Sequence, residues 1–310
     1  MDDKFNGTYI TIDGYEELHK YKYLYFLILF AVYVFVICSN STIVYLIWFH
    51  QNLHEPMYIF IAALSVNSIL FSTAVYPKFF IDILSERQII SYSACLFQFL
   101  MFYSLGASDF LLLSAMAYDR YVSICKPLQY TTIMRQTTVI IFLGLAWLVP
   151  ACHLASMVAL NANQKLCSFT LNGIFCNNSV YKLHCETSKV LSIYGVVVMI
   201  DVVFIPVVFI LFTYTKILII TYKSSRDVRK KAAETCVPHL LVLFSFFCLS
   251  VYDVIIARLQ FDFPKVVRLI MTLQIVLYNP LFNPIIYGLK MKEISKHLKR
   301  LVCNCNKREM

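Results

Sequence analysis

The chain has 310 residues and a formal net charge of +9, and 59% of its residues are hydrophobic whereas only 15% are charged. Soluble domains average about 45–50% apolar and about 25% charged residues, so this composition excludes an ordinary soluble protein and indicates a membrane protein. The seven glycines are spaced so that neither GxGxxG nor GxxxxGK[ST] occurs, which argues against a nucleotide-dependent enzyme.

Seven stretches are long and apolar enough to cross a bilayer, whose core of about 30 Å requires about 20 residues per helix. They do not alternate as the strands of a membrane β-barrel do, so helices are expected. The expected spans are Leu24–Trp48, Met57–Tyr76, Leu96–Tyr118, Thr138–Leu160, Val190–Tyr222, Cys236–Ala257 and Val266–Leu289. The predicted fold is an all-α membrane protein, a seven-transmembrane helix bundle with a short amphipathic C-terminal helix. Its parts are an extracellular N-terminal segment (1–23), the bundle (24–289) and a cytoplasmic amphipathic helix with a tail (290–310).

The distribution of charge predicts the orientation of the bundle. Sixteen of the 27 lysines and arginines lie in Arg120–Arg135, Lys216–Lys231 and Lys290–Arg308, and the other eleven lie toward the opposite face. The positive-inside rule then places the N-terminus outside and the C-terminus in the cytoplasm. Residues 1–23 lack the basic start of a signal peptide, so the first span is expected to direct membrane insertion. The net charge indicates contact with membrane lipids and not with nucleic acid.

Asparagines and cysteines on each side of the membrane predict modifications. Asn6 and Asn177 lie in glycosylation sequons on the outer side, whereas the sequon at Asn40 lies inside the first span and is expected to be unmodified. Four cysteines in outer segments allow three disulfide pairings. Cys303 and Cys305 follow a basic amphipathic stretch, where palmitoylation and free thiols are both open. The histidines and cysteines lack metal-ligand spacing, so no metal site is expected.

The end of the third span reads Met116-Ala117-Tyr118-Asp119-Arg120-Tyr121-Val122-Ser123-Ile124-Cys125. This pattern resembles the signature of odorant receptors within the rhodopsin-like G-protein-coupled receptors. Three further stretches carry the same resemblance in the right order, and with it they cover nearly the whole chain: Leu53–Tyr58, Lys231–Leu240 and Asn283–Tyr287. Asn67-Ser68 through Tyr76-Pro77-Lys78 is most similar to the fish-type branch.

The resemblance implies a plasma-membrane receptor, not an enzyme. Such a receptor binds a small odorant, needs no cofactor and activates a stimulatory heterotrimeric G protein that raises cyclic AMP. The residues to which the resemblance gives coupling or switching roles are Asp119, Arg120, Tyr121, Tyr214, Asn283, Pro284 and Tyr287. It implies that Arg120 is held near Asp119 at rest and is freed to meet the G protein. The alternative is that this charged pair only fixes the helix end at the headgroups.

Asp109 and Asp201 lie in the interior of expected spans, where an ionisable residue is functional by default. The resemblance suggests that Asp109 forms a polar cluster with Asn67, Ser68 and Asn283. Ser68 stands where the wider superfamily carries an acid, which argues against sodium binding there. Asp201 in the fifth span either contacts a ligand or pairs with a neighbouring helix, and pairing is the favoured interpretation.

The outer half of the bundle is the expected place for the ligand. The resemblance implies the disulfides Cys95–Cys176 and Cys167–Cys185. Helical spacing and shared depth predict a pocket formed by Phe102, Tyr103, Gly106, Ala107, Val198, Met199, Val202, Ser250, Val251 and Val254, although core packing explains such a stripe as well. Phe102 stands where amine receptors carry Asp and Leu277 where opsins carry the retinal lysine, so an amine or retinal is not expected.

Two other classes of function remain open. A rhodopsin-like receptor for a lipid or a peptide would share the general motifs, but Met116–Cys125 and Lys231–Leu240 together are odorant-type. A small membrane transporter could use Asp109 and Asp201 to carry protons, yet the chain shows no matching halves with broken helices, as transporters often do.

Overall fold

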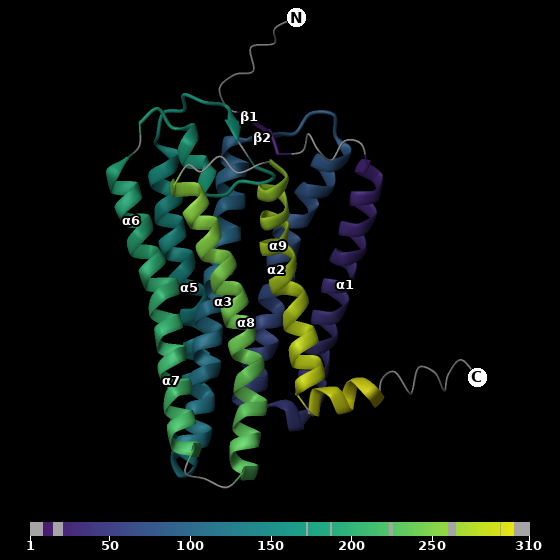
Figure 1. Ribbon diagram of the computed structural model, residues 1–310, viewed down its shortest axis with the longest axis vertical. Coiled ribbons are helices and arrows are strands. Elements are labelled where there is room, and N and C mark those ends of the chain that lie inside the picture. Colours follow the sequence, from purple (N-terminus) through teal and green to yellow (C-terminus); the bar gives the residue numbers. More distant parts are fainter. Residues whose placement is uncertain are drawn as a thin grey trace, which may run out of the picture.

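The computed structural model of the protein describes residues 9–14, 21–171, 173–186, 188–222, 226–259, 265–291 and 293–300. Long helices run side by side along one axis of the molecule (Figure 1). They are α1 (Lys22–Phe49), α2 (Pro56–Leu84), α3 (Tyr92–Cys125), α5 (Gln136–Ala162), α6 (Lys189–Met199) continued by the π-helical turn η5 (Ile200–Phe204) and by α7 (Ile205–Tyr222), α8 (Arg226–Leu259) and α9 (Lys265–Lys290). Short helical elements join or follow them: η2 (Gln51–Leu53), η3 (Pro127–Gln129), α4 (Tyr130–Ile133) and η4 (Asn178–Leu183).

Each expected span lies inside one of these helices, with the fifth span distributed over α6, η5 and α7. Within the described residues, five helical stretches are long and apolar enough to cross a membrane: α1, α2, α3, α5 and Lys189–Tyr222. Within the described side chains of α8, His239–Tyr252 forms a shorter apolar stretch. Many apolar side chains remain exposed on the outside of the bundle, as expected for helices that face lipid.

Buried apolar side chains hold the bundle together in two main clusters. One cluster lies in the inner half, where Phe60, Leu113 and Ile217 are almost completely buried. The other lies toward the outer end, where Tyr76, Phe79 and the disulfide-bonded cysteines of α3 and the loop before η4 are buried. Between them, a small third cluster closes α3 against α5 and α6; it consists of Phe99, Ala107, Leu154, Met157, Val198 and Val202.

Prolines interrupt the backbone hydrogen bonds of several helices, and polar side chains compensate for this. Asn40 is completely buried, and its amide donates to the carbonyls of Val36 (2.9 Å) and Pro280 (3.0 Å), which joins α1 to α9. The hydroxyl of Ser114 donates to the carbonyl of Pro206 (3.4 Å), just after the π-helical turn. Because Pro284 cannot donate to the carbonyl of Pro280 four residues earlier, the Asn40 amide supplies the donor that this carbonyl lacks.

Three short strands cover the outer end of the bundle, and the sequence did not predict them. β1 (Tyr9–Ile12) lies between β2 (Ile89–Ser91), with which it is antiparallel, and β3 (Thr170–Leu171), with which it is parallel. Ile10 and Ile12 are buried while Tyr9 is exposed, so β1 has the alternation of a half-buried strand. In a window of only four residues this period is too short to separate a strand from a loop by sequence alone.

A short helix at residues 293–300 lies across the bundle at the end opposite β1 (Figure 1). Its apolar residue Ile294 is completely buried, whereas Lys296, Lys299 and Arg300 are exposed. This helix is amphipathic, as the sequence predicted, and its basic side is free to face lipid headgroups.

Candidate functional site

Two disulfide bonds fix the loop that covers the bundle. Cys95 at the start of α3 is bonded to Cys176, and Cys167 is bonded to Cys185. The structure therefore contains the pairing that the resemblance implied. The amide nitrogen of Cys176 donates to the side chain of buried Gln98 (3.1 Å), which gives the loop a second attachment to α3. The loop residues after Cys176 are thereby held against the helices.

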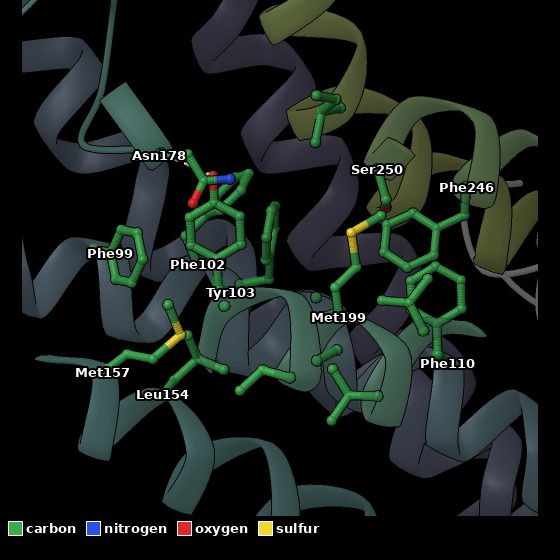
Figure 2. Close-up of a pocket in the computed structure, with 18 of the residues that line it drawn as sticks. Phe99, Phe102, Tyr103, Phe110, Leu154, Met157, Asn178, Met199, Phe246 and Ser250 are labelled. Carbon is green, nitrogen blue, oxygen red and sulfur yellow. Dashed lines mark hydrogen bonds between the residues drawn. The ribbon is translucent and has the colours of Figure 1, made fainter. Parts of the chain in front are cut away.

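A cavity of about 120 Å³ lies beneath this loop, between α3, α5, α6 and α8 (Figure 2). Its walls are mainly aromatic and aliphatic. The lining residues are Phe71, Phe99, Phe102, Tyr103, Gly106, Ala107, Phe110, Leu154, Met157, Asn178, Tyr181, Gly195, Val198, Met199, Val202, Val203, Phe246, Ser250 and Ile275. An apolar cavity of roughly 150 Å³ in another protein binds benzene, so this space suits a small organic molecule.

Eight of the ten residues expected to form the pocket line this cavity; Val251 does not, and the side chain of Val254 lies outside the described residues. Sequence reasoning missed Phe99 and Phe110, although they continue the helical spacing of Phe102 and Gly106 along α3. It also missed Asn178 and Tyr181, which come from the covering loop. Helical periodicity carries no signal for residues that a loop contributes.

The chemistry of the cavity is that of a neutral site. Among the described residues that line it, none carries a formal charge. Its polar groups are the hydroxyls of Tyr103, Tyr181 and Ser250 and the amide of Asn178, and the backbone nitrogen of Asn178 donates to the Tyr103 hydroxyl (3.0 Å). A few polar groups in an apolar wall can orient one hydrogen-bonding group of a ligand. The site therefore favours a small, uncharged molecule with one acceptor or donor.

The four residues of the expected polar cluster are all buried below the cavity, where they form two hydrogen-bonded pairs. The amide of Asn67 donates to a carboxylate oxygen of Asp109 (2.7 Å), and the amide of Asn283 donates to the Ser68 hydroxyl (3.1 Å). The indole of Trp147 donates to the side-chain oxygen of Asn67 (3.0 Å), a contact that sequence reasoning missed. Only two Trp residues are present, and a Trp N–H normally has a partner when it is buried, which was the available signal.

The oxygens of this cluster differ in what they already bind. The oxygen of Asn67 accepts from Trp147 and the oxygen of Ser68 accepts from Asn283, whereas the side-chain oxygen of Asn283 is buried without a hydrogen-bond donor. Within the described part of the chain, no group of three or more His, Cys, Asp or Glu residues is arranged to hold a metal ion.

At the inner end of α3, Asp119 has a different partner from the one expected. Its buried carboxylate accepts a hydrogen bond from the hydroxyl of Tyr130 in α4 (2.8 Å), and the described residues contain no ion pair between Asp119 and Arg120. Burial and the nearby carboxylate raise the pKa of Tyr130, so this hydroxyl keeps the proton that it donates. Arg120 and Tyr121 are half-buried next to this contact. The hydrogen-bond donor to Asp119 is therefore Tyr130, while the charge of Arg120 lies near enough to act on the same carboxylate.

Tyr214 and Tyr287, the two tyrosines with expected switching roles, approach the same histidine. Tyr214 on α7 and Tyr287 on α9 are buried, and the ring of buried His239 on α8 lies between them, with centroid distances of 5.8 Å and 6.3 Å. Asn283 and Pro284 are buried one turn earlier on α9. His239 was missed as a site residue, although a histidine within a membrane span was itself a signal. Three helices that border the inner face thus meet at one aromatic contact.

Asp201 does not line the cavity, and it pairs with a neighbouring helix as the favoured interpretation expected. Its carboxylate lies 3.0 Å from Nε2 of His153 on α5.

Asn177 is half-buried, and its side-chain oxygen accepts from the backbone nitrogen of Ser179 (3.0 Å). Asn6, Cys303 and Cys305, the other residues with expected modifications, lie outside the described residues.

Comparison with known proteins identifies the family. A family model described as olfactory receptor matches residues 29–305. Olfactory receptor 11A1 of Homo sapiens is 31% identical over 300 residues, which cover 96% of this chain and 94% of that protein. Olfactory receptor 51E1 of Homo sapiens is 31% identical over 299 residues, with 96% and 94% coverage, and olfactory receptor 4E1 of Homo sapiens is 31% identical over 306 residues, with 97% and 95% coverage. The matched region begins within α1 and includes the other long helices and the residues that line the aromatic cavity, and the chain belongs to the olfactory receptor family.

Proposed function

We propose that this chain binds a small, neutral odorant in the cavity under the disulfide-bonded loop and activates a stimulatory G protein, which raises cyclic AMP. Membership of the olfactory receptor family makes the chain a multi-pass plasma-membrane receptor for odorants, not an enzyme. The observation that carries the proposal is the uncharged cavity of about 120 Å³, most of whose lining residues are aromatic or aliphatic. A charged ligand would lose its hydration there without gaining a counter-ion.

The inner face supports the second half of the proposal. Tyr130 donates the hydrogen bond to Asp119, and within the described residues no ion pair joins Asp119 to Arg120, which supports a role for the Arg120 guanidinium toward a partner. In our proposal, the G-protein carboxyl terminus enters between Arg120, Tyr214 and the basic start of α8 when the inner end of α8 moves outward. His239 packs between Tyr214 and Tyr287, so a displacement of α8 must separate these rings. A ligand drives this change only if it binds the active arrangement more tightly than the resting one.

The orientation belongs to the same proposal. β1 and the helix at residues 293–300 lie at opposite ends of the bundle (Figure 1), which is consistent with an outer N-terminus and an inner C-terminus. Antibody against epitope tags on intact cells tests this directly. The tag at the N-terminus is expected to be reached and the tag at the C-terminus is not, and access to both ends would reject the proposal.

A ligand screen tests the function itself. Cells that express the chain are exposed to amino acids, bile acids, prostaglandins and volatile carbonyl compounds, and cyclic AMP is measured. Because the cavity is neutral and small, we expect responses to volatile carbonyls and none to amino acids or bile acids. Arg120→Ala is expected to reach the surface and give no response. A variant that signals as strongly as the parent would reject the coupling role of Arg120.

A further inference from the structure

A single imidazole ring connects α5 to the π-helical turn behind the cavity. Nδ1 of His153 lies 3.2 Å from the Tyr194 hydroxyl on α6, and Nε2 lies 3.0 Å from the carboxylate of Asp201 in η5. A carboxylate accepts, so Nε2 carries the hydrogen, and in the neutral ring Nδ1 then accepts from Tyr194. We call these two hydrogen bonds the His153 bridge.

The His153 bridge lies well inside the length of α5 and is partly exposed on the outside of the bundle. His153 is nine residues before the end of α5, which places it roughly 14 Å from that end of the helix. The Asp201 side chain is 47% exposed and that of His153 is 27% exposed, so both are accessible from the lipid side. A carboxylate within a membrane span is costly without a hydrogen-bond donor. The hydrogen bond from His153 therefore stabilises the arrangement in which the bridge is formed.

Each member of the bridge is next in sequence to a residue that lines the cavity. Leu154 follows His153, Gly195 follows Tyr194, and Val202 follows Asp201. Successive helical residues point about 100° apart, so the outer face carries the bridge while the same turns form the cavity wall. The π-helical turn adds a residue at this point, which allows Asp201 to face α5 while Val202 faces the cavity.

The inner side of these turns packs through apolar side chains. Leu154 and Met157 of α5 pack with Val198 of α6 and Val202 of η5 in the small third cluster. Leu154, Met157 and Met199 lie around the same space in Figure 2. Apolar packing is non-directional, and it allows two helices to slide or separate slightly when a larger molecule enters. Hydrogen bonds fix both distance and direction.

We propose that His153 is a specificity-determining positioning residue, because its bridge to Tyr194 and Asp201 fixes the separation of α5 and α6 and so limits the length of ligand that the cavity accepts. This inference rests on the proposed function, since it concerns the same cavity. It differs from a ligand-contact role, because neither His153 nor Asp201 lines the cavity.

The test uses the purified full-length chain and straight-chain aldehydes from butanal to decanal as probes. The shift in apparent unfolding temperature measures binding of each aldehyde. In the wild type, affinity is expected to rise about fourfold per added methylene until the cavity is full and then to fall. In His153→Leu, which lacks both hydrogen bonds, the chain length with the highest affinity is expected to increase by at least one carbon.

Matched variants separate the bridge from a general effect of the substitution. Ser156→Leu is the control, because Ser156 lies in the same lipid-facing groove but its hydroxyl donates only within α5, to the carbonyl of Cys152 (2.9 Å). It is expected to keep the wild-type optimum. Asp201→Asn keeps an acceptor for Nε2, so the chain length with the highest affinity should stay that of the wild type. Asp201→Leu lacks this acceptor and should shift that chain length as His153→Leu does. If His153→Leu does not fold, Tyr194→Phe removes one of the two bonds and is expected to shift the optimum in the same direction.

Cyclic AMP measured with the same aldehydes distinguishes this inference from the proposed function. If the optimum for binding shifts but no aldehyde raises cyclic AMP, the His153 bridge stands and the proposed coupling fails. If the wild type signals but all variants share one optimum, the function stands and the role of His153 is overturned. If no aldehyde stabilises or activates the wild type, the cavity is not the ligand site and both are rejected.

Discussion

The hydroxyl of Tyr130 is the most informative single group to remove, because it decides how Asp119 and Arg120 interact. In the structure it donates to the Asp119 carboxylate at 2.8 Å, and Asp119 is only 1% exposed. A hydrogen bond to a charged group contributes about 1.5–3 kcal/mol. In Tyr130→Phe the buried carboxylate loses this donor, and the nearest replacement is the guanidinium of the next residue, Arg120.

An ion pair between Asp119 and Arg120 would take the arginine away from the G protein. Since about 1.4 kcal/mol corresponds to a factor of ten, the loss of the Tyr130 hydrogen bond is worth about tenfold or more in the coupling equilibrium. We expect Tyr130→Phe to lower the potency of an agonist by about this factor. The assay is the cyclic AMP concentration–response curve in cells, with surface expression measured in parallel.

Two variants serve as controls for this prediction. Tyr118→Phe also removes a phenolic hydroxyl, but the Tyr118 ring packs against Phe142 and Phe209, so no change in potency is expected. Asp119→Asn still accepts from Tyr130 and cannot form an ion pair with Arg120, so it should keep the response. Unchanged or increased potency of Tyr130→Phe at equal surface expression would refute the reasoning.

Three other buried or enclosed positions give further predictions. Trp147→Phe leaves the buried oxygen of Asn67 without its donor, so the free energy of unfolding should fall by about 1–3 kcal/mol, seen as a lower apparent unfolding temperature than for the parent. At Gly106 an added Cβ would meet Phe246 at 3.9 Å, so Gly106→Ala should fold and respond to small aldehydes, whereas Gly106→Leu should fill the cavity; an undiminished response of the leucine variant would contradict the placement of the ligand. Burial lowers the pKa of His184 in the folded chain from its usual 6.5. The neutral ring therefore contributes to the free energy of unfolding above about pH 6.5, and this contribution is lost as the pH falls through the lower pKa of the folded chain. His184→Gln should weaken this dependence in unfolding scans between about pH 5 and 7.5, and an equal dependence in both proteins would reject the assignment to His184.

The sequence alone determined the position of the helices and the family. The hydrocarbon core forces each span to have about 20 apolar residues, and this length is readable without any tertiary information. Each expected span accordingly lies within an observed helix. Helical periodicity also pointed to the side of α3 that lines the cavity, since Phe102, Gly106 and Phe110 recur every four residues.

Only the tertiary structure decided which polar groups meet. Asp119 lies beside Arg120 in the chain but is bonded to Tyr130, and His153 finds Asp201 at a separation of 48 residues. Likewise, β1 is held between two loops, and Tyr181 reaches the cavity because a disulfide folds its loop inward. A local pattern records which face of a helix is apolar, but a hydrogen bond depends on where two distant backbones place their side chains to within a few tenths of an ångström. That placement is a property of the packed bundle, and no single stretch of the chain contains it.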